Sequence, residues 1–229
     1  MNAARIAELL APFIGEHDAP ALFASISTYV DILARWNARI NLTAIRDPEQ
    51  IVTRHFGESL FLARHLFPRG TSAIACPAEQ SPAAAVSCAL ADLGSGAGFP
   101  GIPIKLWAPS ISLALIESNH KKAAFLGEIT RSLRLTDVNI QNTRAETLPP
   151  AAFDVVTLRA VERFDAALPF AARLLKLQGR LALLIGSAQV RQVRSLLPDH
   201  DFSDPLPIPL STSRVLLVGE RSSGPESRY

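Results

Sequence analysis

The chain has 229 residues, of which 48% are hydrophobic and 19% are charged, and its formal net charge at pH 7 is +2. This length and composition allow one large domain with a sizeable core, or one domain with a small addition. The charge balance is too weak to indicate a nucleic-acid partner by itself, because the first seventy residues carry seven basic and seven acidic side chains. The two cysteines, Cys76 and Cys88, exclude a disulfide framework and a cysteine metal site.

The N-terminal stretch MNAARIAELLAPFIGEHD mixes acids into a helical spacing of apolar residues. It lacks the basic start and apolar block of a signal peptide. No apolar run of the sequence is long enough to span a bilayer. We therefore expect a soluble cytoplasmic protein with no membrane partner.

Apolar residues at helical spacing predict a helical region over residues 1–68. One helix covers 3–14, a second runs from about Pro20 to Arg39, and a third begins at Asp47-Pro48-Glu49, where Asp serves as N-cap and Pro occupies the first turn. Residues 69–89 are rich in Ala, Ser and Pro and indicate a loop or insertion.

From residue 90 the pattern changes to short apolar runs that alternate with helical stretches. The helical stretches include Lys121–Leu135 and Asp165–Leu175. The runs expected to form strands are Leu90–Leu93, Ser112–Ile116, Val138–Gln141, Phe153–Leu158 and Arg180–Ile185. This alternation predicts an α/β fold with a doubly wound, mostly parallel sheet over residues 90–219.

The C-terminal part of the chain has a different pattern. Two strand-like runs, Pro205–Leu210 and Arg214–Val218, are separated by Ser-Thr-Ser and predict a hairpin at the sheet edge. Residues 220–229 are expected to form a disordered tail.

A glycine-rich stretch, DLGSGAGFPGIP, follows the first predicted strand of the sheet. Gly94, Gly96 and Gly98 are spaced G-x-G-x-G after Asp92, and the sixth position, where a dinucleotide fold has glycine, is Phe99. No Gly-Lys-Ser/Thr follows, so the stretch is not a Walker sequence. A strand, a glycine loop and a helix together form a nucleotide-binding geometry, and this spacing is typical of S-adenosylmethionine-dependent methyltransferases. Three glycines by chance in an ordinary loop remain the alternative.

Polar residues follow three further strands and share the carboxyl edge of the predicted sheet. Glu117, 23 positions beyond Gly94, is placed to accept hydrogen bonds from the ribose hydroxyls of an adenosine. The turn at Ala145-Glu146 would lie beside the adenine, and Arg159 would point into the same crevice. The alternatives are a surface acid at Glu117, a solvated loop acid at Glu146 and a structural ion pair at Arg159.

Four motifs together resemble one bacterial family, the ribosomal RNA small subunit methyltransferase G family, also called glucose-inhibited division protein B. They are WNxxxNLTAI (36–45), RHF with ESL (54–60), GSGAGFPGIP (94–103) and ESNHKKAAFL (117–126). The resemblance covers roughly residues 20–218. It implies methyl transfer from S-adenosylmethionine to N7 of a guanine in small-subunit (16S) ribosomal RNA, either naked or in the 30S particle, by a cytoplasmic monomer.

The resemblance also implies roles for particular residues. Cofactor contacts carried over are Gly94, Phe99, Ala145, Glu146 and Arg159. Glu117 joins them by its own position at a strand end, and Gly96 and Asp92 join them from the loop itself. Candidate RNA contacts are Asn37, Arg39, Asn41, Arg54 and His55. A cap or turn role for the asparagines and a packed helix position for His55 are equally good interpretations.

The sequence departs from the family pattern at several positions. Gly57 and Glu58 stand where an aliphatic residue and Asp are usual, and Leu158 where Ser is usual. Ile185 and Val215 replace a Lys and a His, two polar groups near strand ends. These two changes put the identity of the substrate in doubt more than the type of reaction.

The expected reaction needs no general base, because guanine N7 carries a lone pair and no proton. Proximity and orientation are then the main catalytic tasks, so no catalytic residue and no metal ligand is predicted. Three alternatives stay open: an NAD-dependent oxidoreductase, a methyltransferase acting on another RNA, a protein or a small molecule, and a non-catalytic binding protein that keeps the cofactor fold.

Overall fold

The computed structural model describes residues 1–15, 19–68, 88–159 and 164–221. Its strands are β1 (Ala89–Leu93), β2 (Ser112–Ile116), β3 (Val138–Gln141), β4 (Phe153–Arg159), β5 (Leu175–Gly186), β6 (His200–Phe202), β7 (Leu206–Pro207) and β8 (Arg214–Arg221). Its α-helices are α1 (Ala3–Ile14), α2 (Pro20–Asn37), α3 (Pro48–Gln50), α4 (Glu58–Leu66), α5 (Gly101–Trp107), α6 (His120–Ser132), α7 (Phe164–Leu174) and α8 (Val190–Leu196). A π-helix, η1 (Ile51–Gly57), joins α3 to α4, and short 3₁₀ turns η2 (Ala145–Thr147) and η3 (Ser187–Gln189) follow β3 and β5.

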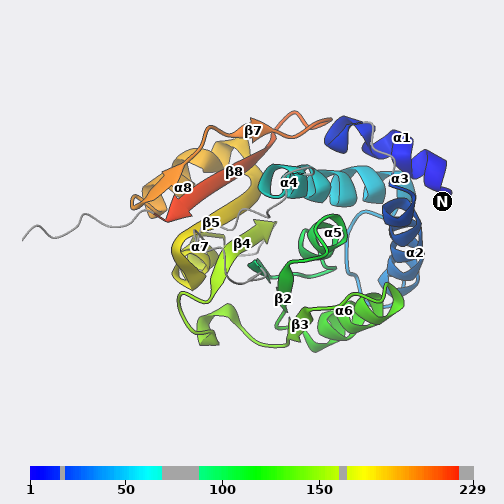
Figure 1. Cartoon of the computed structure of the whole chain (residues 1–229), viewed down its shortest axis with the longest axis horizontal. Helices are drawn as coiled ribbons and strands as arrows, with labels where there is room; N and C mark the ends of the chain where they lie inside the picture. Colours follow the sequence, from blue (N-terminus) through cyan, green and yellow to red (C-terminus); the bar gives the residue numbers. More distant parts are fainter. Residues whose placement is uncertain (16–18, 69–87, 160–163, 222–229) are drawn as a thin grey trace, which may run out of the picture.

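The strands form one sheet in the order β3-β2-β1-β4-β5-β8-β6, with β7 also paired to β8 (Figure 1). The first five strands are parallel, and β8 runs antiparallel to β5, β6 and β7. The predicted doubly wound, mostly parallel α/β fold is therefore confirmed. The predicted hairpin exists as β7–β8, but β8 lies inside the sheet, with β6 and β7 on its outer side.

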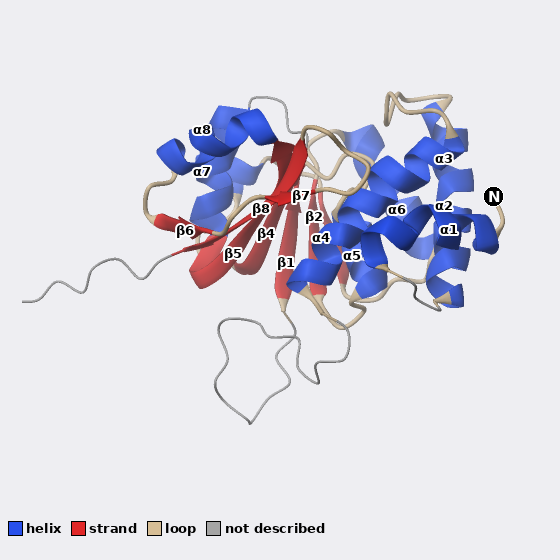
Figure 2. Cartoon of the chain, turned by 90° about the horizontal axis from the view of Figure 1, so that it is seen from above, coloured by secondary structure: helices blue, strands red, loops and turns tan. Residues whose placement is uncertain are grey.

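Helices cover both faces of the sheet (Figure 2). Residues of β1 and β2 alternate between the two faces, as the two-residue period of a strand requires. Leu90 and Leu113 pack in a core with α1, α2, η1, α4, α5 and α6. Ala91 and Ala114 pack in a second core with α7 and α8. The N-terminal helices thus share one continuous core with the sheet.

The start of the third helix is set by its sequence. The side chain of Asp47 accepts a hydrogen bond from the backbone N–H of Gln50 at 2.8 Å, and Pro48 occupies the first helical position, as predicted. The segment continues through η1 into α4. Gly57, at the end of η1, faces Phe13 of α1 so closely that a Cβ there would lie 2.6 Å from the phenyl ring. Glycine at this position lets the first helix pack onto η1.

Most of the predicted loop at 69–89 and most of the predicted tail at 220–229 lie outside the described residues. None of the described helices is both long and apolar enough to cross a membrane.

Candidate functional site: a glycine loop and pocket at the carboxyl edge of the sheet

The glycine loop connects β1 to α5 at the edge where the parallel strands end, here called the carboxyl edge. Its three alternate glycines have positive φ angles, 68° at Gly94, 56° at Gly96 and 82° at Gly98. A side chain is strongly disfavoured in this left-handed region, whereas glycine adopts it freely. The backbone conformation of the loop therefore requires glycine at these three positions.

Asp92 fixes the base of the loop. Its carboxylate is buried, accepts a hydrogen bond from the Gly101 N–H at 3.0 Å and another from the Thr157 hydroxyl at 3.0 Å. Burial raises the pKa of Asp92 to about 6, although these bonds lower it. Asp92 thus ties β1 to β4 and to the first residue of α5.

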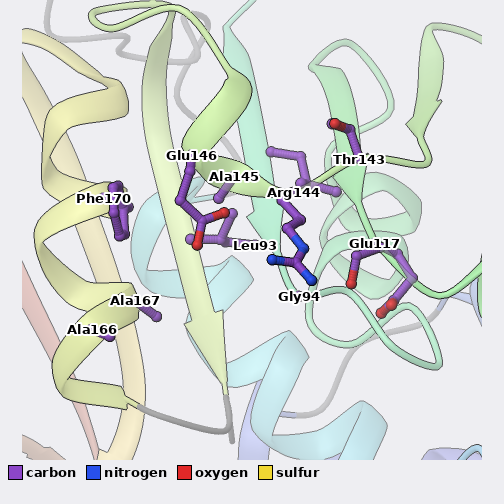
Figure 3. Close-up of a pocket in the computed structure, with 12 residues that line it drawn as sticks. Leu93, Gly94, Glu117, Thr143, Arg144, Ala145, Glu146, Ala166, Ala167 and Phe170 are labelled. Carbon is purple, nitrogen blue, oxygen red and sulfur yellow. The ribbon is translucent and has the colours of Figure 1, made fainter.

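A pocket of about 420 Å³ opens beside the loop (Figure 3), a volume in the usual range for a small-molecule site. It lies at the carboxyl edge, and one wall comes from α7. Its lining residues are Leu93, Gly94, Ile116, Glu117, Ser118, Thr143, Arg144, Ala145, Glu146, Ala166, Ala167 and Phe170. A lining that combines apolar side chains with charged and hydroxyl groups suits a ligand that has both a flat ring and hydroxyl groups.

Glu117 is the buried acid of this pocket, with 7% of its surface exposed. One carboxylate oxygen accepts the Gly96 N–H at 2.9 Å and the other accepts the Asn119 N–H at 2.7 Å. These bonds hold the carboxylate in one orientation, and each oxygen keeps a further acceptor position. The group is therefore ready to accept hydrogen bonds from two adjacent hydroxyls.

Of the eight predicted cofactor residues, the pocket gathers four: Gly94, Glu117, Ala145 and Glu146. The other four lie elsewhere around the loop and do not line the pocket. Gly96 and Asp92 support it through the hydrogen bonds described above, and Phe99 and Arg159 face the N-terminal helices.

Aromatic side chains from the N-terminal helices pack on the back of the loop. The Phe99 ring stacks on Tyr29 of α2 at 5.4 Å between centroids and on His55 of η1 at 4.8 Å. The Tyr29 hydroxyl, fully buried, donates a hydrogen bond to the backbone oxygen of Ala97. The helical layer therefore fixes the conformation of the loop.

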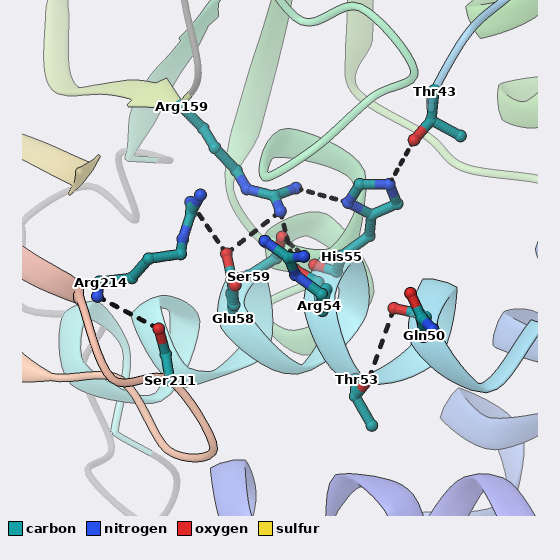
Figure 4. A network of polar contacts seen from close by, with 10 residues as sticks. All are labelled: Thr43, Gln50, Thr53, Arg54, His55, Glu58, Ser59, Arg159, Ser211 and Arg214. Carbon is teal, nitrogen blue, oxygen red and sulfur yellow. Dashed lines mark hydrogen bonds and ion pairs between the residues drawn. The ribbon is translucent and has the colours of Figure 1, made fainter. Parts of the chain in front are cut away.

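His55 lies in a chain of hydrogen bonds that begins in the WNxxxNLTAI motif (Figure 4). The side-chain amide of Asn37 bonds both the N–H and the carbonyl of Thr43 at 2.9 Å, which holds the connection after α2 in place. The Thr43 hydroxyl lies 2.8 Å from His55 Nε2, and Arg159 donates to His55 Nδ1 at 3.0 Å. Nδ1 is therefore an acceptor, and Nε2 carries the proton and donates it to Thr43.

The charge state of His55 follows from its surroundings. Burial and the nearby guanidinium groups of Arg159, Arg54 and Arg214 lower the pKa of His55 to about 3. The imidazole is neutral at physiological pH, which agrees with the tautomer that the hydrogen bonds require.

Arg159 ends in a buried ion cluster (Figure 4). Its guanidinium pairs with Glu58 at 3.1 Å and donates to the backbone oxygen of Arg54 at 2.7 Å, while Arg214 pairs with the same Glu58 oxygen at 3.0 Å. Burial lowers the pKa of Arg159 to about 10, so it stays charged. The structure thus has the ion pair that was the alternative interpretation of Arg159, and a cofactor contact by this residue stays a prediction.

The candidate RNA residues fall into two groups. Asn37 and His55 belong to the internal network, and Asn37 is buried. Arg39, Asn41 and Arg54 are exposed. Sequence reasoning missed three members of the network, Thr43, Glu58 and Arg214. The acid at Glu58 was the available signal, because an acid in an apolar helical stretch needs a buried partner.

The two departures Ile185 and Val215 lie opposite each other on β5 and β8. Both side chains are buried in the core shared with α7 and α8. Because they are direct cross-strand partners, an apolar residue at one position favours an apolar residue at the other. The two changes therefore form a single local repacking.

Solved structures of methyltransferases share this fold. Ribosomal protein L11 methylase from Lactobacillus delbrueckii subsp. bulgaricus matches with a TM-score of 0.55 at 15% identity, over 72% of this chain and 79% of that chain. P. horikoshii TYW2 in complex with MeSAdo matches with a TM-score of 0.56 at 14% identity, over 74% of this chain and 63% of that chain. At these identities the likeness concerns the fold.

Sequence relatives are closer. The Ribosomal RNA small subunit methyltransferase G of Xylella fastidiosa (strain 9a5c) is 36% identical over 194 residues, which cover 83% of this chain and 82% of the relative. The protein of the same name from Chloroflexus aggregans (strain MD-66 / DSM 9485) is 33% identical over 219 residues, or 90% of this chain and 85% of the relative. A family model, GidB, described as rRNA small subunit methyltransferase G, matches residues 23–203. With the glycine loop, the pocket and the WNxxxNLTAI network in place, this chain belongs to the rRNA small subunit methyltransferase G family.

Proposed function

We propose that this chain transfers a methyl group from S-adenosylmethionine to N7 of a guanine in small-subunit (16S) ribosomal RNA. The observation that carries the proposal is the pocket beside the glycine loop, with the Glu117 carboxylate held by the N–H groups of Gly96 and Asn119. Membership of the family supplies the reaction and the RNA substrate. The substrate presents N7 on an accessible, unpaired or extruded base.

The residues of the pocket fit S-adenosylmethionine. Glu117 has free acceptor positions for the two ribose hydroxyls, and the backbone at Gly94 has no side chain to obstruct a ligand. Apolar groups of Ala145 and Phe170 offer a flat wall for the adenine. S-adenosylmethionine supplies an electrophilic methyl group on a sulfonium centre.

The chain's own contribution is to position the reactants. Guanine N7 has a lone pair and no proton, so no side chain has to remove one. Residues around the loop hold the cofactor and the base in line, and a rigid loop lowers the cost of that alignment. Tyr29 provides this rigidity through its bond to Ala97, and Asp92 provides it through its bond to Gly101.

We further propose cofactor contacts at Phe99 and Arg159, and RNA contacts at Arg39, Asn41 and Arg54. The exposure of these last three residues supports an RNA-facing role. A monomeric, cytoplasmic enzyme is part of the same proposal. Light scattering of the purified chain, with and without 30S particles, measures the oligomeric state.

The proposal is tested by mass spectrometry of small-subunit RNA from cells that lack the gene. We expect one N7-methylguanosine to be missing and to return when the gene is restored. A gene with Glu117→Ala should fail to restore it. An unchanged set of modified nucleosides in the deletion strain would refute the RNA substrate, and calorimetry with S-adenosylmethionine would then show whether cofactor binding survives.

A further inference from the structure

A second hollow of about 320 Å³ lies between η1 and the loop at residues 209–213 that precedes β8. We call it the arginine pocket, because Arg54 and Arg214 line it together with Glu58 and hydroxyl residues. Arg214 pairs with Gly186, the last residue of β5, so the hollow also lies at the carboxyl edge of the sheet. It shares none of its lining residues with the pocket beside the glycine loop.

The charges around the arginine pocket do not balance. The network holds three guanidinium groups, of Arg54, Arg159 and Arg214, but only two carboxylates among the described residues, that of Glu58 and, near Arg159, that of Asp92. The Glu58 carboxylate already forms ion pairs with Arg159 and Arg214. Within the described part of the chain, Arg54 makes no ion pair, and Arg214 Nε has no hydrogen-bond partner. The pocket therefore has spare positive charge and spare N–H donors.

The loop that forms the other wall is held rigidly. Ile208 N–H bonds the Arg214 carbonyl at 3.1 Å, and the Ser211 hydroxyl accepts the Arg214 N–H at 3.1 Å. Ser187 N–H bonds the Ser213 carbonyl at 2.7 Å. These bonds leave the exposed side chain of Thr212 at the rim of the pocket. A loop fixed in this way loses little conformational entropy when a ligand binds.

We propose that the arginine pocket binds a phosphate group of the RNA backbone while the target guanine lies near the cofactor. Guanidinium groups bind phosphate through paired N–H donors, and hydroxyls add further hydrogen bonds. The inference rests on the proposed function, because it assigns to the RNA substrate a contact that lies outside the cofactor pocket. A free phosphate ion has the same chemistry and is distinguished from RNA by the test below.

The test measures how the affinity for naked small-subunit ribosomal RNA depends on salt. Each phosphate contact contributes about 0.7–0.9 to the slope of log affinity against log salt. We expect Arg54→Gln to reduce that slope by about this amount and to weaken binding equally for unrelated RNA sequences. Arg191→Gln removes the same charge from an exposed position on α8, on the other face of the sheet, and should leave the slope unchanged.

Two further variants guard against loss of folding. Arg214→Gln should reduce the slope like Arg54→Gln, but it also removes a partner of the buried Glu58, so its thermal melt is measured in parallel. Thr212 is exposed, and Thr212→Glu should weaken RNA binding about fivefold or more, because it brings a negative charge to the rim. Arg54→Gln, Thr212→Glu and Arg191→Gln should bind S-adenosylmethionine with unchanged affinity.

The outcomes separate the two proposals. If the wild-type chain methylates ribosomal RNA but Arg54→Gln and Thr212→Glu bind RNA with unchanged slope and affinity, the arginine pocket is not a phosphate site. If these variants lose affinity for S-adenosylmethionine instead, the pocket serves the cofactor and the inference is overturned. Binding of inorganic phosphate that Arg54→Gln abolishes, together with RNA affinity and slope that the same variant leaves unchanged, would assign the pocket to a free ion. If the variants show the expected slope changes but the wild-type chain transfers no methyl group to the RNA, the proposed function alone is refuted.

Discussion

Gly98→Ala tests the packing of the glycine loop against the N-terminal helices. Gly98 has a φ of +82°, and an added Cβ would lie 2.4 Å from the Tyr29 hydroxyl, 2.7 Å from Ile102 Cδ1 and 3.1 Å from Leu126 Cδ2. Tyr29 is fully buried and bonded to the Ala97 carbonyl, so its hydroxyl has little freedom to move. Gly96 provides the matched control, because its φ is +56° and the nearest atom to an added Cβ is 3.7 Å away.

The expected loss of stability has two parts. An alanine in the left-handed region costs about 1–2 kcal/mol, and about 0.4–1 kcal/mol of this is offset because alanine restricts the unfolded chain. Gly96→Ala should therefore lower the free energy of unfolding by about 1 kcal/mol. Overpacking adds about 1–3 kcal/mol. Gly98→Ala should therefore lose about 2–4 kcal/mol in total.

Urea unfolding followed by circular dichroism measures these differences. Tyr29→Phe removes the hydroxyl that lies nearest to the added Cβ, so the double variant with Gly98→Ala should lose at least 1 kcal/mol less than the sum of the two single variants. Equal stabilities of Gly96→Ala and Gly98→Ala, or strict additivity in the double variant, would show that the Tyr29 hydroxyl does not clash with a side chain at position 98.

Three other predictions concern charge and contact. The pKa of His55 is about 3 in the folded state, below its unfolded value, so the folded state is stable with respect to this group above pH 6.5 and loses free energy of unfolding as the pH falls toward 3. Between pH 8 and pH 5 the free energy of unfolding of the wild-type chain should fall by about 2 kcal/mol more than that of His55→Gln, as measured by urea unfolding at both pH values. An equal fall in the two proteins would contradict this prediction. Asp92, whose raised pKa acts in the opposite direction, is common to both proteins and cancels. Glu117→Gln should weaken S-adenosylmethionine binding by about 10- to 100-fold in calorimetry, because an ionised acceptor is lost; an unchanged affinity would exclude the ribose role. Arg39→Glu should slow methyl transfer to 30S particles and keep the cofactor affinity, and equal loss of both would count against an RNA contact.

The strands of the parallel sheet were predictable because each is a short apolar run bounded by turn residues. β2 and β3 have the bounds that the pattern predicts. β5 begins at Leu175, five residues before the predicted start, because its first part contains exposed Leu177 and Gln178, the latter with a φ of +60°, and has no apolar pattern. β6 is three residues long and owes its place to pairing with β8. A strand this short shows no two-residue alternation of apolar and polar residues in the sequence.

The site was predictable where chemistry follows backbone geometry. The glycine spacing predicts positive φ angles at these positions. The place of Glu117 at a strand end predicts that it lines the pocket. The ion cluster around Arg159 was not predictable, because its partner Glu58 lies 101 positions away and Arg214, the second partner of Glu58, enters from an antiparallel strand. Contacts over such separations depend on the assembled fold, and local sequence patterns do not encode them.

The aromatic packing behind the glycine loop restricts how this protein can be engineered. A chimera that joins the sheet to helices from another methyltransferase would have to supply a ring of the same size where Tyr29 stands, or the loop would lose its rear wall. Grafting α2 and η1 together with the sheet preserves this wall, because Tyr29, His55 and Phe56, the aromatic partners of Phe99, are grafted with them. The smallest transplantable methyl-transfer unit of this protein therefore starts at its amino-terminal helices.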